Sequence, residues 1–395
     1  MFERTSRFAP IRKLMSQAGL AIQALKPVFM MSPLSVANFL PPGTVNFDLV
    51  IFDEASQVRP ADALGAIVRA KQAVVVGDSK QLPPTSFFDT LTTSDEDDEG
   101  VATTDIESIL GLFCSRSAHQ RMLRWHYRSK DESLIEASNH LFYDNRLVVF
   151  PSPDQRRENL GLIYHRIANA PYDRSRTRTN PTESRMIADA VMKHAVEQLQ
   201  LEPNERLTLG VSAFSVAQRD SILDQLEILR KTRPELEEFF VTPPHEPFFV
   251  KNLENVQGDE RDVIFISVGY GRTSEGYLAM SFGPVNRDGG ERRLNVLFSR
   301  ARKRCEVFTT LSSDDIELTA TSGSGLRALK HFLQFAEHGR LGIPTPPDAL
   351  PIRPLKRRFS TSCSAGASKF IPRWAVRGSS LTWRSLTRLH RAATS

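Results

Sequence analysis

The sequence predicts an α/β protein built on parallel sheets. Residues 49–52 and 73–76 are unbroken apolar runs, which is typical of strands buried on both faces of a parallel sheet. Segments with helical periodicity alternate with strand-like segments along the chain, as they do when helices connect parallel strands. The length of 395 residues and a hydrophobic share of 40% are enough for two ordinary cores.

The first half of the chain, residues 1–148, is predicted to form one domain. Pro60 favours the start of a helix between the two apolar strands, because proline is tolerated in the first helical turn. In chain order, the expected elements are a helix over residues 11–25, a strand over 28–31, the strands 49–52 and 73–76 with a helix over 61–70 between them, and a helix over 132–142.

A second α/β unit is predicted over residues 149–343, after the prolines at 151 and 153. Its strands again alternate with helices, which indicates a second parallel sheet. In chain order, the expected elements are a helix over residues 183–199, a strand over 207–213, a helix over 216–231, a strand over 263–268, a glycine-rich loop over 283–290, a helix over 292–303 and a strand over 306–309.

The net charge of +5 is concentrated at the end of the chain. Residues 349–395 hold ten Lys and Arg and no Asp or Glu, so the remaining 348 residues carry 51 − 10 = 41 basic against 46 acidic side chains. We expect residues 344–395 to be a disordered basic tail. A tail with Trp374 and Trp383 could instead bind single strands by charge and stacking, and translation in a shifted frame is a further explanation of its composition.

Composition excludes several protein classes. Cys114, Cys305 and Cys363 are too few and too widely spaced for a disulfide framework or a Cys-x-x-Cys zinc site. No apolar run approaches the roughly 20 residues that cross a bilayer, and the first residues lack the apolar core of a secretion signal. We therefore expect a cytoplasmic protein with no membrane partner.

Polar side chains follow the two apolar strands where each strand ends. Ligands bind beyond the carboxyl ends of strands in open α/β sheets, and Asp53, Glu54 and Gln81 fall there. A carboxylate such as Asp53 can hold Mg²⁺ against a triphosphate, and Glu54 can deprotonate an attacking water. The neutral amide of Gln81 can sense phosphate. The structural alternatives are a surface Asp-Glu pair and a polar turn.

Two arginines complete the predicted chemistry. Arg128 lies in the sequence Trp-His-Tyr-Arg-Ser, and Arg300 lies in a segment whose Leu294, Leu297 and Phe298 form an apolar helical face. Arginine donates a fixed fork of N–H groups to phosphate, and such side chains accelerate phosphoryl transfer by roughly 10³- to 10⁵-fold. A solvated basic helix face is the alternative for each segment taken alone.

The order of these segments resembles the superfamily 1 DNA/RNA helicases, and within them the Upf-like group. The likeness extends over roughly residues 28 to 310. The segments similar to family motifs are Val-Phe-Met-Met-Ser-Pro-Leu-Ser at 28–35 (motif Ib), Val-Ile-Phe-Asp-Glu-Ala-Ser-Gln at 50–57 (motif II, Walker B), Gly-Asp-Ser-Lys-Gln-Leu-Pro-Pro at 77–84 (motif III), Tyr-Arg-Ser at 127–129 (the Tyr-Arg element), Val-Ser-Ala-Phe-Ser-Val-Ala-Gln at 211–218 (motif IV), Val-Gln-Gly-Asp-Glu-Arg-Asp at 256–262 (motif V) and Arg-Leu-Asn-Val-Leu-Phe-Ser-Arg-Ala-Arg at 293–302 (motif VI).

The resemblance implies two RecA-like domains of the P-loop NTPase type, the first of them incomplete, and an ATP-dependent helicase or translocase that uses ATP and Mg²⁺. It also implies a single-stranded DNA or RNA partner, which such proteins bind mostly through phosphate contacts and stacking. By resemblance, the roles are Asp53 for magnesium, Glu54 as general base, Gln81 as coupling residue, Arg128 and Arg300 at the γ-phosphate, Gly258 and Glu260 beside the nucleotide, and Ser32, Gln218 and Gln257 toward the nucleic acid.

One family motif is missing from the sequence. The pattern Gly-x-x-x-x-Gly-Lys-Ser/Thr, whose backbone N–H groups and lysine hold the phosphates of the nucleotide, occurs nowhere in the 395 residues. We therefore expect a helicase fragment that is inactive alone, or half of a motor completed by another polypeptide that supplies this P-loop. The alternative function is a non-catalytic nucleic-acid-binding or scaffold protein with a helicase-like fold.

Overall fold

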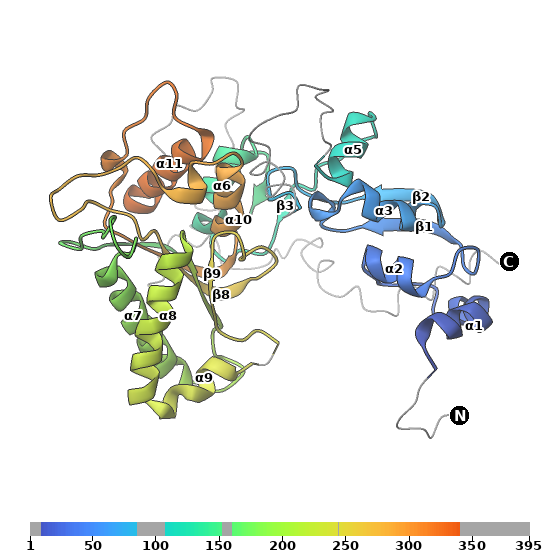
Figure 1. Ribbon diagram of the computed structural model, residues 1–395, viewed down its shortest axis with the longest axis horizontal. Helices are drawn as coiled ribbons and strands as arrows, with labels where there is room; N and C mark the ends of the chain where they lie inside the picture. Colours follow the sequence, from blue (N-terminus) through green and yellow to red (C-terminus); the bar gives the residue numbers. More distant parts are fainter. Residues whose placement is uncertain (1–8, 85–106, 152–159, 244, 340–395) are drawn as a thin grey trace, which may run out of the picture. The chain divides into compact units, whose positions relative to one another are not determined.

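The computed structural model describes residues 9–84, 107–151, 160–243 and 245–339 (Figure 1). The predicted disordered tail at 344–395 lies outside the described residues. Within the described ranges, no helix is both long and apolar enough to span a bilayer. The chain is a mixed α/β protein with parallel sheets, so the predicted fold class is confirmed.

The two apolar strands form a small parallel sheet. β1 (Phe47–Phe52) pairs with β2 (Ala70–Val75), with Phe47 opposite Ala70 and Phe52 opposite Val75. A short 3-10 helix, η1 (Ala55–Gln57), and the helix α3 (Pro60–Ile67) connect them. Pro60 occupies the first turn of α3, as predicted from the sequence.

One face of this sheet differs from the prediction that both faces are buried. Phe52 is 6% exposed, but Leu49 is 44%, Ile51 is 60% and Val74 is 45% exposed. Residues alternate between the two faces of a strand, and α3 and α5 (Ile109–Ser115) pack with one face only. On the opposite face, Phe47 packs against Met15, Leu40 and Val45 at the start of β1, but Leu49, Ile51 and Val74 stay exposed to solvent.

The segment before this sheet is helical rather than partly extended. Helix α1 (Ile11–Leu25) matches its prediction, but residues 28–31, predicted as a strand, form no strand. They precede the helix α2 (Pro33–Phe39), which Ser32 caps. Val28 and Met30 are 78% and 94% exposed. The apolar run therefore lacks the neighbouring strand that would stabilise an extended conformation.

The predicted second parallel sheet is confirmed. Its order is β5-β9-β8-β6-β7, and every neighbouring pair is parallel. The strands are β5 (Gly161–Arg166), β6 (Leu209–Ala213), β7 (Phe249–Asn252), β8 (Arg261–Ser267) and β9 (Ala301–Thr309).

Helices cover both faces of this sheet (Figure 1). On one face Val263 and Phe265 of β8 pack with residues of α7 and α8, and on the other face Ile264 and Ile266 pack with residues of α10 and α11. The helices of this part are α7 (Pro181–Leu199), α8 (Val216–Thr232), α9 (Glu237–Val241), α10 (Gly290–Phe298) and α11 (Ser324–His338), with the 3-10 helices η2 (Pro234–Leu236), η3 (Gly283–Val285) and η4 (Ser313–Asp315).

Helix α6 (Ser133–Phe142) packs in the core of this larger sheet. Leu134 and Ala137 are 4% and 3% exposed and belong to the cluster that contains α10 and α11. Two short parallel strands, β3 (Trp125–His126) and β4 (Val148–Val149), flank α6 in the chain. Residues before 149 thus contribute to this core, while the domain boundaries given above stay a prediction.

Helix α10 is shorter than the predicted helix over residues 292–303. It ends at Phe298, and β9 begins at Ala301, which pairs with Arg261 of β8. Arg300 consequently lies in the turn between a helix and a strand, and Arg302 lies on the strand. Pairing with β8 outweighs the helical pattern of these residues.

Candidate functional site

The two predicted carboxylates lie in a tight turn after β1. Both are exposed, and Glu54 has a left-handed backbone with φ 49° and ψ 40°, which is uncommon for a residue other than glycine. The backbone N–H of Glu54 donates to Oδ1 of Asp53 at 3.0 Å. Such a conformation persists only where its surroundings fix it, and it is concentrated at functional sites.

Gly77 allows the turn after β1 to approach the loop after β2. The Ala55 N–H donates to the Val76 carbonyl at 2.9 Å, which extends the ladder past the strand ends. A Cβ atom on Gly77 would lie 3.0 Å from the Ser56 nitrogen and 3.1 Å from the Ala55 nitrogen. A side chain at residue 77 would therefore push the carboxylates away from the following loop.

Asp78 organises the loop that carries Gln81. Its Oδ1 accepts from the Lys80 N–H at 2.8 Å, and its Oδ2 accepts from the Gln81 side-chain amide at 3.1 Å. The Tyr143 hydroxyl donates to the same Oδ2 at 2.5 Å. The orientation of Gln81 is thus set through Asp78, which is linked to α6.

Asn295 of α10 joins this loop to the larger sheet. It is fully buried, and its Nδ2 donates to the Lys80 carbonyl at 3.0 Å and to the Tyr143 hydroxyl at 2.8 Å. Burial, and then the charge of Asp78, raises the pKa of Tyr143, so the phenol stays protonated. The loop after β2 is therefore held by two elements that pack on the larger sheet.

Arg300 is buried close to three other predicted site residues. It is 5% exposed, and its Nε donates to the Val296 carbonyl at 2.8 Å. Burial, and then the charge of Arg128, lowers the pKa of Arg300 to about 10, while Glu54 and Glu260 act in the opposite direction. The guanidinium of Arg300 is thus within electrostatic range of one like charge, Arg128, and of two opposite charges, Glu54 and Glu260.

Glu260 pairs with arginines from two segments. Its Oε2 lies 2.9 Å from Nε of Arg128, and its Oε1 lies 3.7 Å from NH1 of Arg302. Arg302 also pairs with Glu246 and Asp262. The Lys130 N–H donates to the Arg302 carbonyl at 2.8 Å, which holds the Arg128 segment beside β9.

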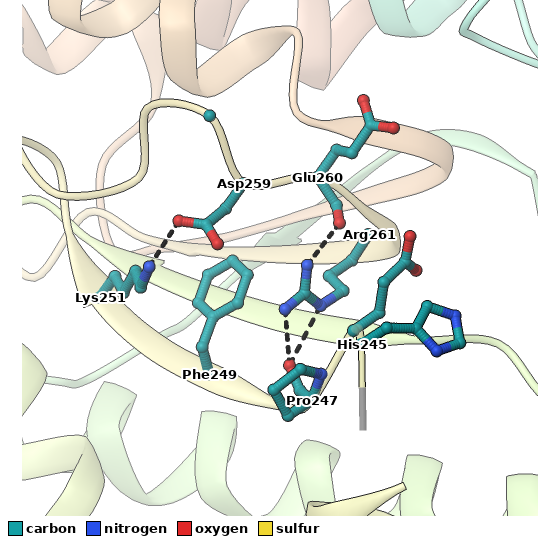
Figure 2. Close-up of a pocket in the computed structure, with 9 residues that line it drawn as sticks. His245, Pro247, Phe249, Lys251, Asp259, Glu260 and Arg261 are labelled. Carbon is teal, nitrogen blue, oxygen red and sulfur yellow. Dashed lines mark hydrogen bonds and ion pairs between the residues drawn. The ribbon is translucent and has the colours of Figure 1, made fainter. Parts of the chain in front are cut away.

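A pocket of about 370 Å³ lies beside Glu260 (Figure 2). Figure 2 shows the Phe249 ring between Lys251 and Arg261, whose charged groups lie 5.3 Å and 4.8 Å from the ring centroid. Lys251 pairs with Asp259, and Arg261 donates to the Pro247 carbonyl. The lining is His245, Glu246, Pro247, Phe249, Lys251, Gly258, Asp259, Glu260 and Arg261.

The other residues of motif V line or adjoin this pocket. Gly258 has φ 85°, and a Cβ there would meet nothing within 4 Å. The Nε2 of Gln257 is buried and has no hydrogen-bond partner among the described residues. Sequence reasoning missed Phe249 and Lys251, because β7 is only four residues long and shows no motif of its own.

Two predicted nucleic-acid contacts have local structural roles. Ser32 is exposed, and its Oγ accepts from the Ser35 N–H at 3.2 Å as the cap of α2. Gln218 is 1% exposed, whereas the sequence analysis expected it toward a nucleic-acid groove. Its amide bonds to the backbone of Asn180 and to the Ser267 hydroxyl. A side chain whose amide is used inside the fold is not available to a strand.

The donors suited to a metal ion are few. No group of three or more His, Cys, Asp or Glu side chains among the described residues could hold a metal by itself. Mg²⁺ is usually held by one or two carboxylates together with substrate phosphates. Asp53 fits that pattern, because its carboxylate is exposed and only Oδ1 is engaged, by the neighbouring N–H.

The structure combines parallel sheets with acidic side chains after β1 and a buried arginine after α10, and two family models match these parts of the chain. The family model AAA_12, described as an AAA domain, matches residues 106–311, and AAA_11, with the same description, matches residues 36–88. The chain therefore belongs to the AAA_12 family of AAA domains. The predicted relationship to superfamily 1 helicases is confirmed at the level of the family.

The chain is similar to proteins named as ATP-dependent helicases. It is 34% identical over 327 residues to the uncharacterized ATP-dependent helicase MG140 of Mycoplasma genitalium, covering 80% of this chain and 28% of that protein. It is 27% identical to the DNA replication ATP-dependent helicase/nuclease dna2 of Schizosaccharomyces pombe, covering 68% of this chain and 19% of that protein. The chain thus spans less than a third of each of these relatives.

Among solved structures, the arterivirus nonstructural protein 10 helicase is similar to this chain with a TM-score of 0.32 and 11% identity. The match covers 68% of this chain and 41% of the viral protein. This likeness is too weak to add to the assignment.

Proposed function

We propose that the chain is part of an ATP-dependent helicase or translocase that couples ATP hydrolysis to movement on single-stranded DNA or RNA. The observation that carries this proposal is the Arg128–Glu260 ion pair at 2.9 Å together with the buried Arg300, whose pKa responds to the charges of Glu54, Arg128 and Glu260. These side chains come from four separate segments. A protein that only bound nucleic acid would have no chemical need to assemble a carboxylate base beside phosphate-binding arginines.

The proposed catalytic roles are those that the resemblance to the helicase motifs implies, and the charges that act on Arg300 support them. Glu54 accepts a proton from the attacking water, which contributes roughly 10²- to 10⁴-fold in rate. Arg128 and Arg300 stabilise the charge that develops on the transferred phosphate. Gln81 is oriented by Asp78. Its amide couples the presence of the γ-phosphate to the binding of the nucleic acid.

The proposed binding roles concern the nucleotide and the strand. Asp53 holds magnesium, and Gly258 and Glu260 lie beside the nucleotide. When bound, magnesium neutralises phosphate charge during the transfer. Ser32 and Gln257 are proposed strand contacts. Gln218 is left out of this set because its side chain is buried and its amide is engaged by other groups.

The residues present fit only part of a magnesium nucleotide. Asp53 fits the metal and the arginines fit the terminal phosphate, but the sequence contains no Gly-x-x-x-x-Gly-Lys-Ser/Thr to hold the triphosphate. We propose that a separate polypeptide segment supplies this P-loop. The exposed face of the β1–β2 sheet, with Leu49, Ile51 and Val74, supports this proposal, because contiguous apolar surface marks a contact with another segment.

Two measurements on the full chain test the proposal. The purified chain should bind single-stranded oligonucleotides in a salt-dependent manner and should show no strand-stimulated ATP hydrolysis. If the chain alone hydrolyses ATP and Glu54→Gln abolishes this hydrolysis, the chain does not need a separate P-loop and that part of the proposal is wrong. Failure to bind any single strand would contradict the nucleic-acid role.

A gain-of-function experiment separates the motor from the scaffold alternative. A strand, a Gly-x-x-x-x-Gly-Lys-Thr loop and a helix are fused ahead of residue 9, and ATP hydrolysis is measured with and without single strands. The motor proposal expects turnover that is lost with Glu54→Gln or Arg300→Ala and kept with Glu202→Gln, a change at an exposed glutamate. Turnover equal in all three variants would support the scaffold alternative.

A further inference from the structure

A loop after β5, here called the arginine loop, carries an arginine at every second position from 174 to 178. Residues 171–178 carry Arg174, Arg176 and Arg178, which are all exposed. No carboxylate lies within ion-pair distance of these three arginines in the part of the chain that the structure describes. The sequence of residues 1–348 as a whole is acidic, with 41 basic against 46 acidic side chains. This cluster of positive charge is therefore a local feature.

The loop is fixed by its own hydrogen bonds. The Asp173 N–H donates to the Thr179 carbonyl at 2.9 Å, and the two residues form an antiparallel bridge. The Asp173 carboxylate accepts from the N–H groups of Arg176 at 3.1 Å and Thr177 at 3.3 Å. These backbone hydrogen bonds lower the pKa of Asp173. The only acid within the loop is thus used to hold its shape.

A second loop, residues 270–277, lies beside the arginine loop and is here called the tyrosine loop because it carries Tyr270 and Tyr277. The Tyr172 N–H donates to the Arg272 carbonyl at 2.8 Å, and the Tyr172 and Tyr270 rings are 5.4 Å apart. Arg174 lies over the Tyr277 ring at 5.4 Å, and Tyr277 is 58% exposed. Two nearby carboxylates lower the net positive charge of this surface. Asp315 neutralises Arg272 in an ion pair, and Glu275 is an exposed negative charge.

Both loops leave the same edge of the larger sheet. The arginine loop follows the carboxyl end of β5, the tyrosine loop follows the carboxyl end of β8, and these two strands flank β9. Ligands of open parallel sheets bind at this edge. Guanidinium groups track phosphates, and an exposed aromatic ring with a neighbouring arginine stacks on bases. The combination fits a single strand better than a duplex, whose bases are already stacked.

We propose that Arg174, Arg176, Arg178 and Tyr277 form a contact surface for single-stranded nucleic acid, here called the Arg-Tyr surface. This inference rests on the proposed function. It adds the path that the single-stranded nucleic acid takes across the larger sheet. The arginines contact phosphates without regard to sequence, and Tyr277 stacks on a base.

The test measures binding of fluorescein-labelled oligo(dT) and oligo(rU) 20-mers to the full chain between about 50 and 300 mM salt. The variant R174Q/R176Q/R178N removes the three charges, with Asn at residue 178 because the backbone there has φ 55°. The matched control R185Q/K193Q/K231Q removes three exposed charges that are paired with Asp189, Glu197 and Glu227. Both variants keep the basic tail, so its contribution to binding is the same.

The expected result is a loss of roughly tenfold or more in affinity at 50 mM salt for the loop variant. Its salt slope should fall by about 2, since each phosphate contact contributes about 0.7 for single strands. The control should stay within about twofold of the wild type. Tyr277→Leu should weaken binding by about fivefold or more through lost stacking. Circular dichroism and thermal melts check that all variants fold.

The outcomes separate this inference from the proposed function. If the wild-type chain binds neither oligonucleotide, the proposed function fails. If it binds and the loop variant behaves like the control, only the Arg-Tyr surface is overturned. If an equal concentration of a 20-residue polyglutamate displaces the oligonucleotide, the Arg-Tyr surface binds acidic protein segments rather than nucleic acid, and this inference is overturned as well. Ultraviolet crosslinking of a bromodeoxyuridine oligonucleotide should label peptides within residues 171–178 or 270–277, and labelling confined to other segments would contradict the inference.

Discussion

Tyr143 donates a hydrogen bond of 2.5 Å to Asp78, which links helix α6 to the loop after β2. Asn295 of α10 donates to the same phenol oxygen at 2.8 Å. One side chain therefore connects the loop of Gln81 with two helices of the larger sheet. This arrangement makes the position of Gln81 depend on the helix that leads to Arg300.

We expect Tyr143→Phe to lower the free energy of unfolding by about 1–3 kcal/mol, because it removes the two hydrogen bonds that join the hydroxyl to Asp78 and Asn295, each worth about 0.5–1.5 kcal/mol. Urea denaturation measures the change. Tyr277→Phe is the matched control, since its ring is 58% exposed, and a change within about 0.5 kcal/mol is expected. Equal losses in both variants would contradict the link.

Glu183 should make stability fall as the pH rises. It is fully buried in α7, and burial raises its pKa from 4.5 to about 8, although donors from Ser267 and Gly269 partly oppose this. Above pH 4.5 the unfolded chain has lost this proton while the folded chain keeps it. Stability from this group is therefore complete below pH 4.5 and is lost as the pH approaches 8.

Glu183→Gln should remove this pH dependence, because the amide resembles the protonated acid in shape and charge. Urea denaturation at several values between about pH 5 and 8 measures the slope. The exposed Glu202→Gln is the control and should keep the decline of the wild type. If the free energy of unfolding of the wild type rises over this pH range, and Glu183→Gln shows the same pH dependence, Glu183 is not the group responsible.

Gly77→Ala should destabilise the first sheet by about 1–3 kcal/mol, the usual cost of forcing extra volume into a packed site. The added Cβ would lie 3.0 Å from the Ser56 nitrogen. Gly65→Ala in α3 is the control, because the nearest atom lies 3.8 Å away, and a helical alanine should add up to about 1 kcal/mol. Thermal melts report both changes, and a stabilising Gly77→Ala would refute the close approach.

The open face of the β1–β2 sheet should tolerate polar residues. Ile51→Thr should change stability by less than about 0.5 kcal/mol, since Ile51 is 60% exposed. Phe52→Ala, one residue later and 6% exposed, should cost about 3–5 kcal/mol. Light scattering should show less self-association for Ile51→Thr than for wild type, and a large loss of stability would mean that this face is covered in solution.

Much of the fold could be predicted because apolar runs and helical periods are local signals. The strand containing residues 49–52 and the helix over residues 11–25 were found for this reason. Residues 28–31 were wrongly predicted as a strand, since an apolar run cannot reveal whether a partner strand lies beside it. β5 and β7 were missed, because a six-residue and a four-residue strand with few apolar runs give little local signal.

Prediction of the site depended on residue type rather than on environment. Glu54, Arg128, Glu260 and Arg300 were singled out by sequence, and the charges of the first three act on the guanidinium of Arg300. The burial of Gln218 could not be predicted, because the partners of its amide, Asn180 and Ser267, lie far away in the chain. Tyr143 was missed for the same reason, since only the fold brings Asp78 and Asn295 to its hydroxyl.

The packing of α6 decides how the protein can be shortened. A piece that began at residue 149 would lack Leu134 and Ala137, which are 4% and 3% exposed, and it would leave the side of α10 and α11 that they cover open to water. A piece that starts ahead of Ser133 keeps this contact. The smallest stable unit around the larger sheet therefore has to include sequence that, judged by its motifs alone, would be assigned to the preceding domain.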